Sequence, residues 1–171
     1  MIVAITGGIG SGKSVVSQVL RLLGYPVYDC DANAKRLMNE SVALRESLVK
    51  RFGTDLYRQG AFNAQYLSSI VFADQSALAD LNAIVHPAVK ADIQDWWREK
   101  GGLVFVETAI PYLSGVHQIV DKIWKVTAPT EVRVERVMAR NGMTRAQVEQ
   151  RIASQASEEV QSDKDVVIIN D

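Results

Sequence analysis

A glycine cluster followed by a lysine and a serine lies near the start of the chain. The stretch IVAITGGIGSGKSVV, residues 2–16, places Gly7, four residues, Gly12, Lys13 and Ser14 in the pattern G-x-x-x-x-G-K-[ST]. This pattern is typical of a phosphate-binding loop. Because glycine lacks a Cβ, such a backbone can curve until its N–H groups point at phosphate oxygens. We expect Lys13 to reach the β- and γ-phosphates and the Ser14 hydroxyl to bind Mg²⁺.

The whole loop is predicted to contact the nucleotide. A helix that starts directly after the loop adds the positive end of its dipole to the anion site. The predicted nucleotide-binding residues are Gly8, Ile9, Gly10, Ser11, Gly12, Lys13, Ser14 and Val15. The dinucleotide-binding fingerprint does not fit, because no glycine stands three residues after Gly10.

Two carboxylates follow the next predicted strand, PVYD at 26–29. They are Asp29 and Asp31. Carboxylates at the carboxyl ends of parallel strands face the ligand crevice. Asp31 is therefore placed either to accept a proton from an acceptor hydroxyl or to bind Mg²⁺ through water. The other interpretation makes both residues solvated turn or cap carboxylates, since Asp31 also occupies the expected N-cap of a helix.

Three arginines share one face of a later helix. Arg133, Arg136 and Arg140 are spaced three and four residues apart, beside the turn signal Asn141-Gly142. Guanidinium groups next to a glycine turn suit a lid that closes on a triphosphate and excludes water. The alternative is a solvated face of ion pairs, which we favour for Arg133 and leave open for Arg136 and Arg140. The acidic residues available for such pairs are Glu131, Glu135 and Glu149.

Short apolar runs and helical patterns alternate along the chain. The expected strands are 2–6, 26–29, 103–107, 123–127 and 165–169, and expected helices include 13–23, 31–39, 130–140 and 144–157. This alternation predicts an α/β fold with a parallel sheet covered on both faces. Residues from about 40 to 100 form a predicted helical insertion, in which Pro87 separates two helices.

Length and composition fit one ordinary globular domain over residues 1–171. Hydrophobic residues make up 47% and charged residues 23%, and the formal net charge is −1. That charge gives no reason to expect a nucleic-acid partner. Cys30 is the only cysteine, so no disulfide can form within the chain. With no signal peptide or long apolar run in the sequence, we expect a cytoplasmic protein without a membrane partner, as a monomer or weak homo-oligomer.

These stretches resemble the dephospho-CoA kinase family. The matching segments are TGGIGSGKS (6–14), DCD (29–31), LNAIVHP (81–87), RVERVMARNGMTRAQVEQRIASQ (133–155) and VVIIND (166–171). They follow the family order and cover nearly the whole chain. The two aspartates, His86-Pro87 and the pair Arg151 and Gln155 are more specific signals than the phosphate loop.

The resemblance implies transfer of the γ-phosphoryl group of ATP, with Mg²⁺, to the ribose 3′-hydroxyl of dephospho-CoA. Asp31 matches the proposed catalytic base and Arg140 matches the lid arginine; Lys13 is the third predicted catalytic residue. The insertion would hold the substrate with Lys35 and His86, and the IIND segment resembles an adenine-binding loop. The implied fold is a three-layer P-loop kinase with sheet order 2-3-1-4-5 and a lid over about 136–150.

Two alternatives remain. Another P-loop kinase for nucleosides or nucleoside monophosphates would share the loop, although phosphate acceptors favour extra arginines and Ala64 stands where the insertion often has one. A GTPase would need a guanine-selecting N-K-x-D and a D-x-x-G after a strand, and neither occurs in the sequence.

Overall fold

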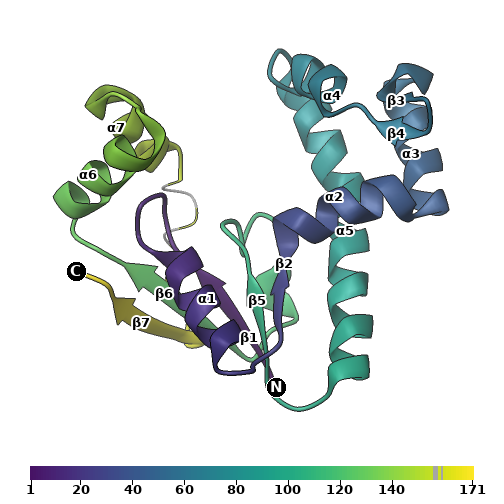
Figure 1. Cartoon of the computed structure of the whole chain (residues 1–171). Helices are drawn as coiled ribbons and strands as arrows, with labels where there is room; N and C mark the ends of the chain where they lie inside the picture. The colour runs from purple at the N-terminus through teal and green to yellow at the C-terminus, as the bar shows by residue number, and fades with distance from the viewer. Residues whose placement is uncertain (156–157, 159) are drawn as a thin grey trace. The chain divides into compact units, whose positions relative to one another are not determined.

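The computed structural model describes residues 1–155, 158 and 160–171, and these form two compact units (Figure 1). Residues 1–29 and 96–171 make the first unit, and residues 30–95 make the second. The strands are β1 (Ile2–Thr6), β2 (Val27–Asp29), β3 (Tyr57–Arg58), β4 (Ala61–Phe62), β5 (Val104–Glu107), β6 (Lys122–Thr127) and β7 (Asp165–Ile169). The α-helices are α1 (Lys13–Leu22), α2 (Cys30–Glu40), α3 (Val42–Phe52), α4 (Ala64–Val71), α5 (Gln75–Lys100), α6 (Thr130–Asn141) and α7 (Arg145–Ser154). Short 3-10 turns lie at Thr54–Leu56 and Val116–Gln118.

The first unit is built on a five-stranded parallel sheet with the order β2-β5-β1-β6-β7. The predicted strands 3, 4 and 5 are labelled β5, β6 and β7 here, because the unpredicted hairpin takes the labels β3 and β4. With this renumbering, the observed order is the predicted order 2-3-1-4-5. All five residues of β1 are buried, as expected for a central strand covered on both faces. The predicted α/β fold is confirmed.

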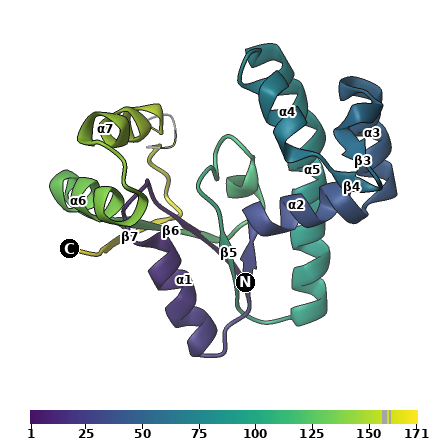
Figure 2. The ribbon, with the colours of Figure 1, turned by 45° about the horizontal axis from the view of Figure 1, so that its top comes forward.

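Helix α1 covers one face of this sheet (Figures 1 and 2). On one face, Leu20 of α1 packs in a core cluster with Val3, Ile5, Phe105 and Val126. On the other face, Tyr28 and Trp96 meet edge to face, with ring centroids 5.3 Å apart. Three layers therefore form, because each sheet face carries apolar side chains that need cover.

The second unit starts earlier than the predicted insertion. Its first helix, α2, holds the β3-β4 hairpin: the Tyr57 hydroxyl donates to the Met38 carbonyl at 2.6 Å, and the Phe62 N–H donates to Asn39 Oδ1 at 3.1 Å. These long-range bonds draw α2 into the unit. The hairpin was not predicted, because two strands of two residues each leave almost no periodic pattern in the sequence.

Two predicted helix boundaries are wrong. Helix α2 begins at Cys30, so Asp31 lies in its first turn instead of at its N-cap. Helix α5 is 26 residues long, from Gln75 to Lys100, and it continues through Pro87 without a break. Proline removes one main-chain hydrogen bond, and the buried side chains of Val85, Val89 and Ile93 on this helix offset that loss through packing.

The predicted lid, about 136–150, falls within two helices, α6 and α7, with Gly142 in the left-handed region between them; this helix pair is called the lid below, and its closing motion stays a prediction. A capping box starts α7: the Thr144 hydroxyl accepts from the Gln147 N–H, and Gln147 Oε1 accepts from the Thr144 N–H. The helix ends at Ser154, before the predicted end at 157; residues 156 and 157 lie outside the described residues. A core of Val134, Val137 and Val148 joins the two helices.

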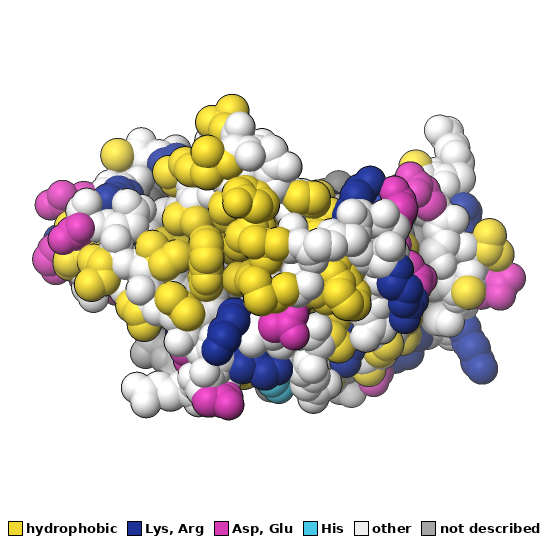
Figure 3. All heavy atoms as spheres, turned by 90° about the horizontal axis from the view of Figure 1, so that it is seen from below, with side chains coloured by type: hydrophobic (Ala, Val, Ile, Leu, Met, Phe, Trp, Pro, Cys, Tyr) yellow, Lys and Arg dark blue, Asp and Glu magenta, His cyan; other side chains and the backbone are white. Residues whose placement is uncertain are grey.

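Hydrophobic side chains also remain on the surface (Figure 3). Leu22 and Leu23 at the end of α1 are 81% and 67% exposed. In the described part of the chain, no helix combines the length and apolar character needed to cross a bilayer.

Two leucines of α1 give a matched test of this packing. Leu20 is 7% exposed and Leu22 is 81% exposed. We expect Leu20→Ala to lower the free energy of unfolding by about 2–5 kcal/mol, because it removes buried methyl groups and leaves a cavity. Leu22→Ala should stay within about 0.5 kcal/mol of the wild type in the same denaturant titration. Equal losses in the two variants would contradict the packing of α1 on the sheet.

Candidate active site

The phosphate loop joins β1 to α1, as the sequence predicts. Gly10 and Gly12 have φ angles of +79° and +91°, which side-chain-bearing residues rarely adopt. The Ser11 N–H donates to the Gly8 carbonyl at 3.1 Å, which closes the turn, and Gly12 caps the N-terminus of α1. The loop thus has the curvature that lets main-chain N–H groups converge on an anion.

The glycines also make room for neighbouring segments. A Cβ on Gly8 would overlap the Arg133 guanidinium, and one on Gly12 would overlap the Asn170 amide. A Cβ on Gly10 would lie 2.5 Å from the Arg133 carbonyl oxygen. Side chains at Gly8 and Gly12 would displace the ends of the Arg133 and Asn170 side chains, whereas one at Gly10 would push the main chain of α6 away from the loop.

Lys13 is ion-paired with Glu107 at the carboxyl end of β5. Lys13 Nζ lies 2.6 Å from Glu107 Oε1, and the two side chains are only 17% and 8% exposed. The Ser14 hydroxyl donates to the same carboxylate oxygen at 3.2 Å. Arg21 approaches the other oxygen at 3.6 Å. The Lys13 ammonium and the Ser14 hydroxyl therefore both contact one carboxylate oxygen, Glu107 Oε1.

Burial by itself would raise the pKa of Glu107. The Lys13 ammonium and the Ser14 hydroxyl oppose this effect, and the pKa of the carboxyl lies below its ordinary value of 4.5. Glu107 is consequently ionised at neutral pH, and it compensates the positive charge of Lys13.

The segment after β7 holds the loop from another side. Asn170 Nδ2 donates to the Ser11 carbonyl at 3.0 Å, and the Asn170 N–H donates to the Thr127 carbonyl at 2.8 Å. Arg136 donates to the Asn170 carbonyl at 2.8 Å. This partly buried bond to a carbonyl does not fit a solvated ion pair, and the role of Arg136 as a lid arginine stays a prediction.

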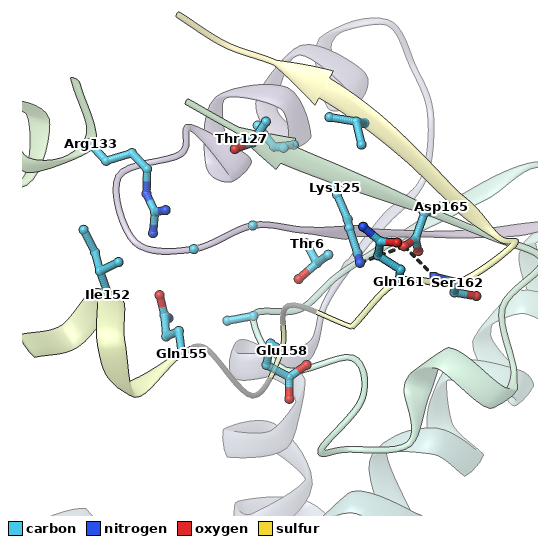
Figure 4. A pocket seen from close by; sticks show the side chains of 15 residues that line it. Thr6, Lys125, Thr127, Arg133, Ile152, Gln155, Glu158, Gln161, Ser162 and Asp165 are labelled. Atoms are coloured by element: carbon cyan, nitrogen blue, oxygen red, sulfur yellow. Dashed lines mark hydrogen bonds and ion pairs between the residues drawn. The ribbon is translucent and has the colours of Figure 1, made fainter. Parts of the chain in front are cut away.

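The two ends of the lid reach the tip of the loop. Arg133 Nε donates to the Ile9 carbonyl at 3.0 Å, and Gln155 Oε1 accepts from the Ile9 N–H at 2.8 Å. Both side chains line a cavity of about 520 Å³ beside Gly7 and Gly8, and they extend from the lid toward the loop (Figure 4). The solvated-face interpretation of Arg133 is therefore wrong, because a main-chain carbonyl that the sequence does not reveal accepts its hydrogen bond.

Two other lid arginines lie away from the loop. Arg140 is exposed at the end of α6, where its Nε donates to Asn141 Oδ1 at 2.8 Å. Arg145 pairs with Glu131 at 2.7 Å and Glu149 at 3.2 Å, and these carboxylates raise the pKa of its guanidinium. The expected solvated ion pairs thus exist, but they involve Arg145.

The remaining predicted site residues lie in the second unit. Asp31 and Lys35 are exposed and stand one turn apart on α2. In chain order Asp31 comes two residues after Asp29, the last residue of β2, which is in register with Glu107. His86 lies within α5, directly before Pro87.

Glu107, which contacts Lys13 and Ser14, is not among the site residues predicted from the sequence. The available signal was its place at the end of the run LVFVE, where an otherwise apolar strand finishes with a carboxylate. The carboxyl end of β5 lies beside β1, from which the phosphate loop starts. The loop contacts of Gln155 and Asn170 depend on tertiary structure and have no local signal of this kind.

Comparison with known proteins decides the family. Residues 1–171 match the family model described as dephospho-CoA kinase. The chain belongs to the dephospho-CoA kinase family. A dephospho-CoA kinase from Porphyromonas gingivalis is 42% identical over 158 residues, covering 92% of this chain and 78% of that protein. The corresponding protein from Geobacter sulfurreducens is 38% identical over 175 residues, covering 99% and 88%.

Solved structures agree with the fold. The crystal structure of TT1252 from Thermus thermophilus has a TM-score of 0.80 at 34% identity and covers 100% of this chain and 88% of that one. A dephospho-CoA kinase from Campylobacter jejuni has a TM-score of 0.72 at 23% identity, covering 99% and 87%, and supports the fold alone. The chain is therefore a P-loop kinase of the dephospho-CoA kinase family, and a nucleoside or nucleoside monophosphate kinase is not favoured.

The buried carboxylate makes a pH-dependent contribution to stability. Because the pKa of Glu107 is lower in the folded chain than its ordinary value of 4.5, the unfolded chain takes up this proton at a higher pH. The contribution is present above that ordinary value and is lost as the pH falls through the folded pKa. When the pH is lowered from about 7 to about 3, we expect the free energy of unfolding to fall less in Glu107→Gln than in the wild type.

Denaturant titrations across that pH range would measure this difference. Glu99→Gln, at a position where the side chain is 71% exposed, serves as the control and should follow the wild type. An acid-induced loss in Glu107→Gln equal to that of the wild type would contradict the lowered pKa.

Proposed function

We propose that the chain transfers the γ-phosphoryl group of ATP to the ribose 3′-hydroxyl of dephospho-CoA, giving ADP and coenzyme A. The observation that carries this proposal is the phosphate loop with Lys13 poised at the end of β5, in a chain that matches the dephospho-CoA kinase family over its whole length. Phosphoryl transfer depends mainly on positioning and charge stabilisation, and the loop supplies both.

The loop binds the nucleotide through its main chain. The N–H groups of Gly8 and of residues 10–14 hold the β-phosphate, while the N–H of Ile9 is bound by Gln155, and the N-terminus of α1 adds its positive dipole. Lys13, at the first position of α1, neutralises charge that develops on the transferred group. Its present partner, Glu107, keeps the ammonium at the correct end of the sheet until phosphate oxygens compete for it.

Ser14 and Glu107 provide oxygen atoms suited to Mg²⁺. Their side chains lie within hydrogen-bond distance of each other, and hydroxyl and carboxylate oxygens are the donors that this ion prefers. Ser14 would bind the ion directly, and Glu107 would bind it directly or through a water. The bound ion would neutralise charge on the β- and γ-phosphates.

Asp31 acts as the general base. Its carboxylate accepts the proton of the 3′-hydroxyl while that oxygen forms a bond to the γ-phosphorus and the bond between the γ-phosphorus and the β–γ bridging oxygen breaks. ADP leaves with the electron pair of the broken bond. The position of Asp31 shortly after β2, whose end is in register with Glu107, and its match to the family base support this role.

The remaining roles concern the lid and the acceptor. Arg140, exposed at the end of α6, closes over the phosphates, and its match to the lid arginine of the family supports this role. Lys35 and His86 of the second unit bind dephospho-CoA. We place the reaction in the cytoplasm with small-molecule partners, since the single cysteine, Cys30, cannot form a disulfide within the chain and the net charge is near zero.

Acceptor-dependent release of ADP from MgATP tests the reaction. Dephospho-CoA, a nucleoside, a nucleoside monophosphate and no acceptor would be compared. We expect ADP with dephospho-CoA alone and a product identical to coenzyme A by mass and retention. ADP formation with a nucleotide acceptor instead would replace the proposed substrate with that of a different P-loop kinase.

Removing the loop cation should mainly slow turnover. We expect Lys13→Ala to remove on the order of 3–5 kcal/mol of transition-state stabilisation, measured from kcat/KM. Lys100→Ala, which removes an exposed lysine paired with Glu99, should leave kcat/KM unchanged. Near-normal turnover in Lys13→Ala would rule out the role given to this residue.

Neutralising the proposed base should separate turnover from binding. Asp31→Asn is expected to lower kcat by about 10²–10⁴-fold while the affinity for ATP changes little. Asp29→Asn provides the comparison with a neighbouring carboxylate. If Asp31→Asn lost ATP affinity but kept its turnover of bound substrate, Asp31 would belong to the metal site.

A further inference from the structure

Ile9, at the tip of the phosphate loop, has both of its main-chain polar groups bound by the lid. Arg133 at the start of α6 donates to its carbonyl, and Gln155 at the end of α7 accepts from its N–H. Gln155 lies 146 residues away along the chain, so this is a tertiary contact that exists when the end of the lid rests on the loop.

Apolar packing joins the same two parts. The Ile9 side chain packs against the lid core of Val134, Val137 and Val148, each of which is fully buried. Ile152, in the last turn of α7 before Gln155, packs against this core as well. The tip of the loop therefore completes the hydrophobic core of the lid.

The chemistry of Gln155 suits a place beside an anion. An amide oxygen can hold the Ile9 N–H without bringing a negative charge toward the phosphates, as a carboxylate would. Fixing this N–H sets the plane of the Gly8–Ile9 peptide, and the bond from Arg133 to the Ile9 carbonyl sets the next plane, which carries the Gly10 N–H. The site needs the direction of the Gly10 N–H to be set before the nucleotide arrives, since preorganised donors lose less on binding.

We propose that Gln155 is a positioning residue. It makes the phosphate-binding conformation of the loop depend on the lid being docked at Ile9. Nucleotide affinity and lid docking are therefore coupled. The proposal rests on the proposed function of the loop as the ATP site. It gives a role to one of the residues that mark the family resemblance. Gln155 acts through the main chain of Ile9 and takes no part in the chemical step.

Two glutamine substitutions at opposite ends of α7 form a matched test. Gln155→Met removes the acceptor at the loop and keeps a side chain of similar length. Gln147→Met removes the comparable bond from Gln147 to the Thr144 N–H, which stabilises α7 but does not touch the loop. Titration calorimetry with ADP and with MgATP, together with kcat and KM for dephospho-CoA, would be measured for both variants.

We expect Gln155→Met to raise the dissociation constants of ADP and MgATP about 3- to 10-fold, the scale of one hydrogen bond, with the KM for dephospho-CoA unchanged. Gln147→Met should leave nucleotide affinity as in the wild type. Equal losses in both variants would reduce Gln155 to a helix-stabilising residue. Unchanged affinity in Gln155→Met, or a fall in kcat alone, would also overturn the proposal.

Amide hydrogen exchange of the wild-type chain tests the bond without any substitution. The Ile9 N–H should be protected in the absence of nucleotide, and exchange as fast as at an open loop would overturn the proposal. Wild-type calorimetry separates the two ideas. If the wild type bound no nucleotide, the proposed function would fail. If the wild type bound nucleotide and Gln155→Met bound it with the same affinity, only the proposed coupling would be refuted.

Discussion

Crowding around the phosphate loop is the constraint on which the rest of the first unit depends. The Arg133 guanidinium and the Asn170 amide occupy the space that a Cβ on Gly8 and on Gly12 would need. The glycines therefore serve two purposes, since they allow the curvature that binds phosphate and they let distant segments approach the main chain. The lid and the segment after β7 take their positions from this approach. A side chain at Gly10 would consequently disturb the main chain of α6 at Arg133, more than 100 residues away in sequence.

Charge in the loop follows from the same geometry. A helix N-terminus and a lysine concentrate positive charge where the triphosphate is expected, and Glu107 balances it in the described structure. Because both members of the pair are largely buried, solvent screens them little, and the position of Lys13 is well defined. The carboxylate stands at the end of a strand whose backbone is fixed by pairing on both sides, with β1 and β2. A site built on such rigid strand ends needs little rearrangement to receive its ligand.

The sequence was sufficient to predict the sheet and the loop, because both leave local signals. Apolar strand runs and the glycine pattern are determined within a few residues, and the predicted strand order is the observed one. Contacts between distant residues were harder to predict. Arg133 was assigned to a solvated face because the Ile9 carbonyl that it binds is invisible in the pattern of side chains. Pro87 was expected to end a helix, and tertiary packing of the surrounding turns outweighs its local preference. Glu107 could have been predicted from the sequence, since it is a carboxylate that ends an apolar strand, and this strand pairs with β1.

The internal bonds of the lid differ in kind from the bonds that tie it to the loop. Helices α6 and α7 are joined by their own valine core and by the ion pair of Arg145 with Glu131, while Arg145 also pairs with Glu149 within α7. The ion pairs of Arg145 are exposed, whereas the valine core also receives the Ile9 side chain from the phosphate loop. Exposed ion pairs contribute little on their own, so the core carries most of the cohesion. In the described part of the chain, the loop meets these helices through two hydrogen bonds, the Ile9 side chain and the close approach of Gly10 to the Arg133 main chain. Because the pair of helices is held together more extensively than it is held to the loop, separation at Ile9 would break fewer interactions than unfolding of the lid. This difference in cohesion is what a lid needs in order to move as one body.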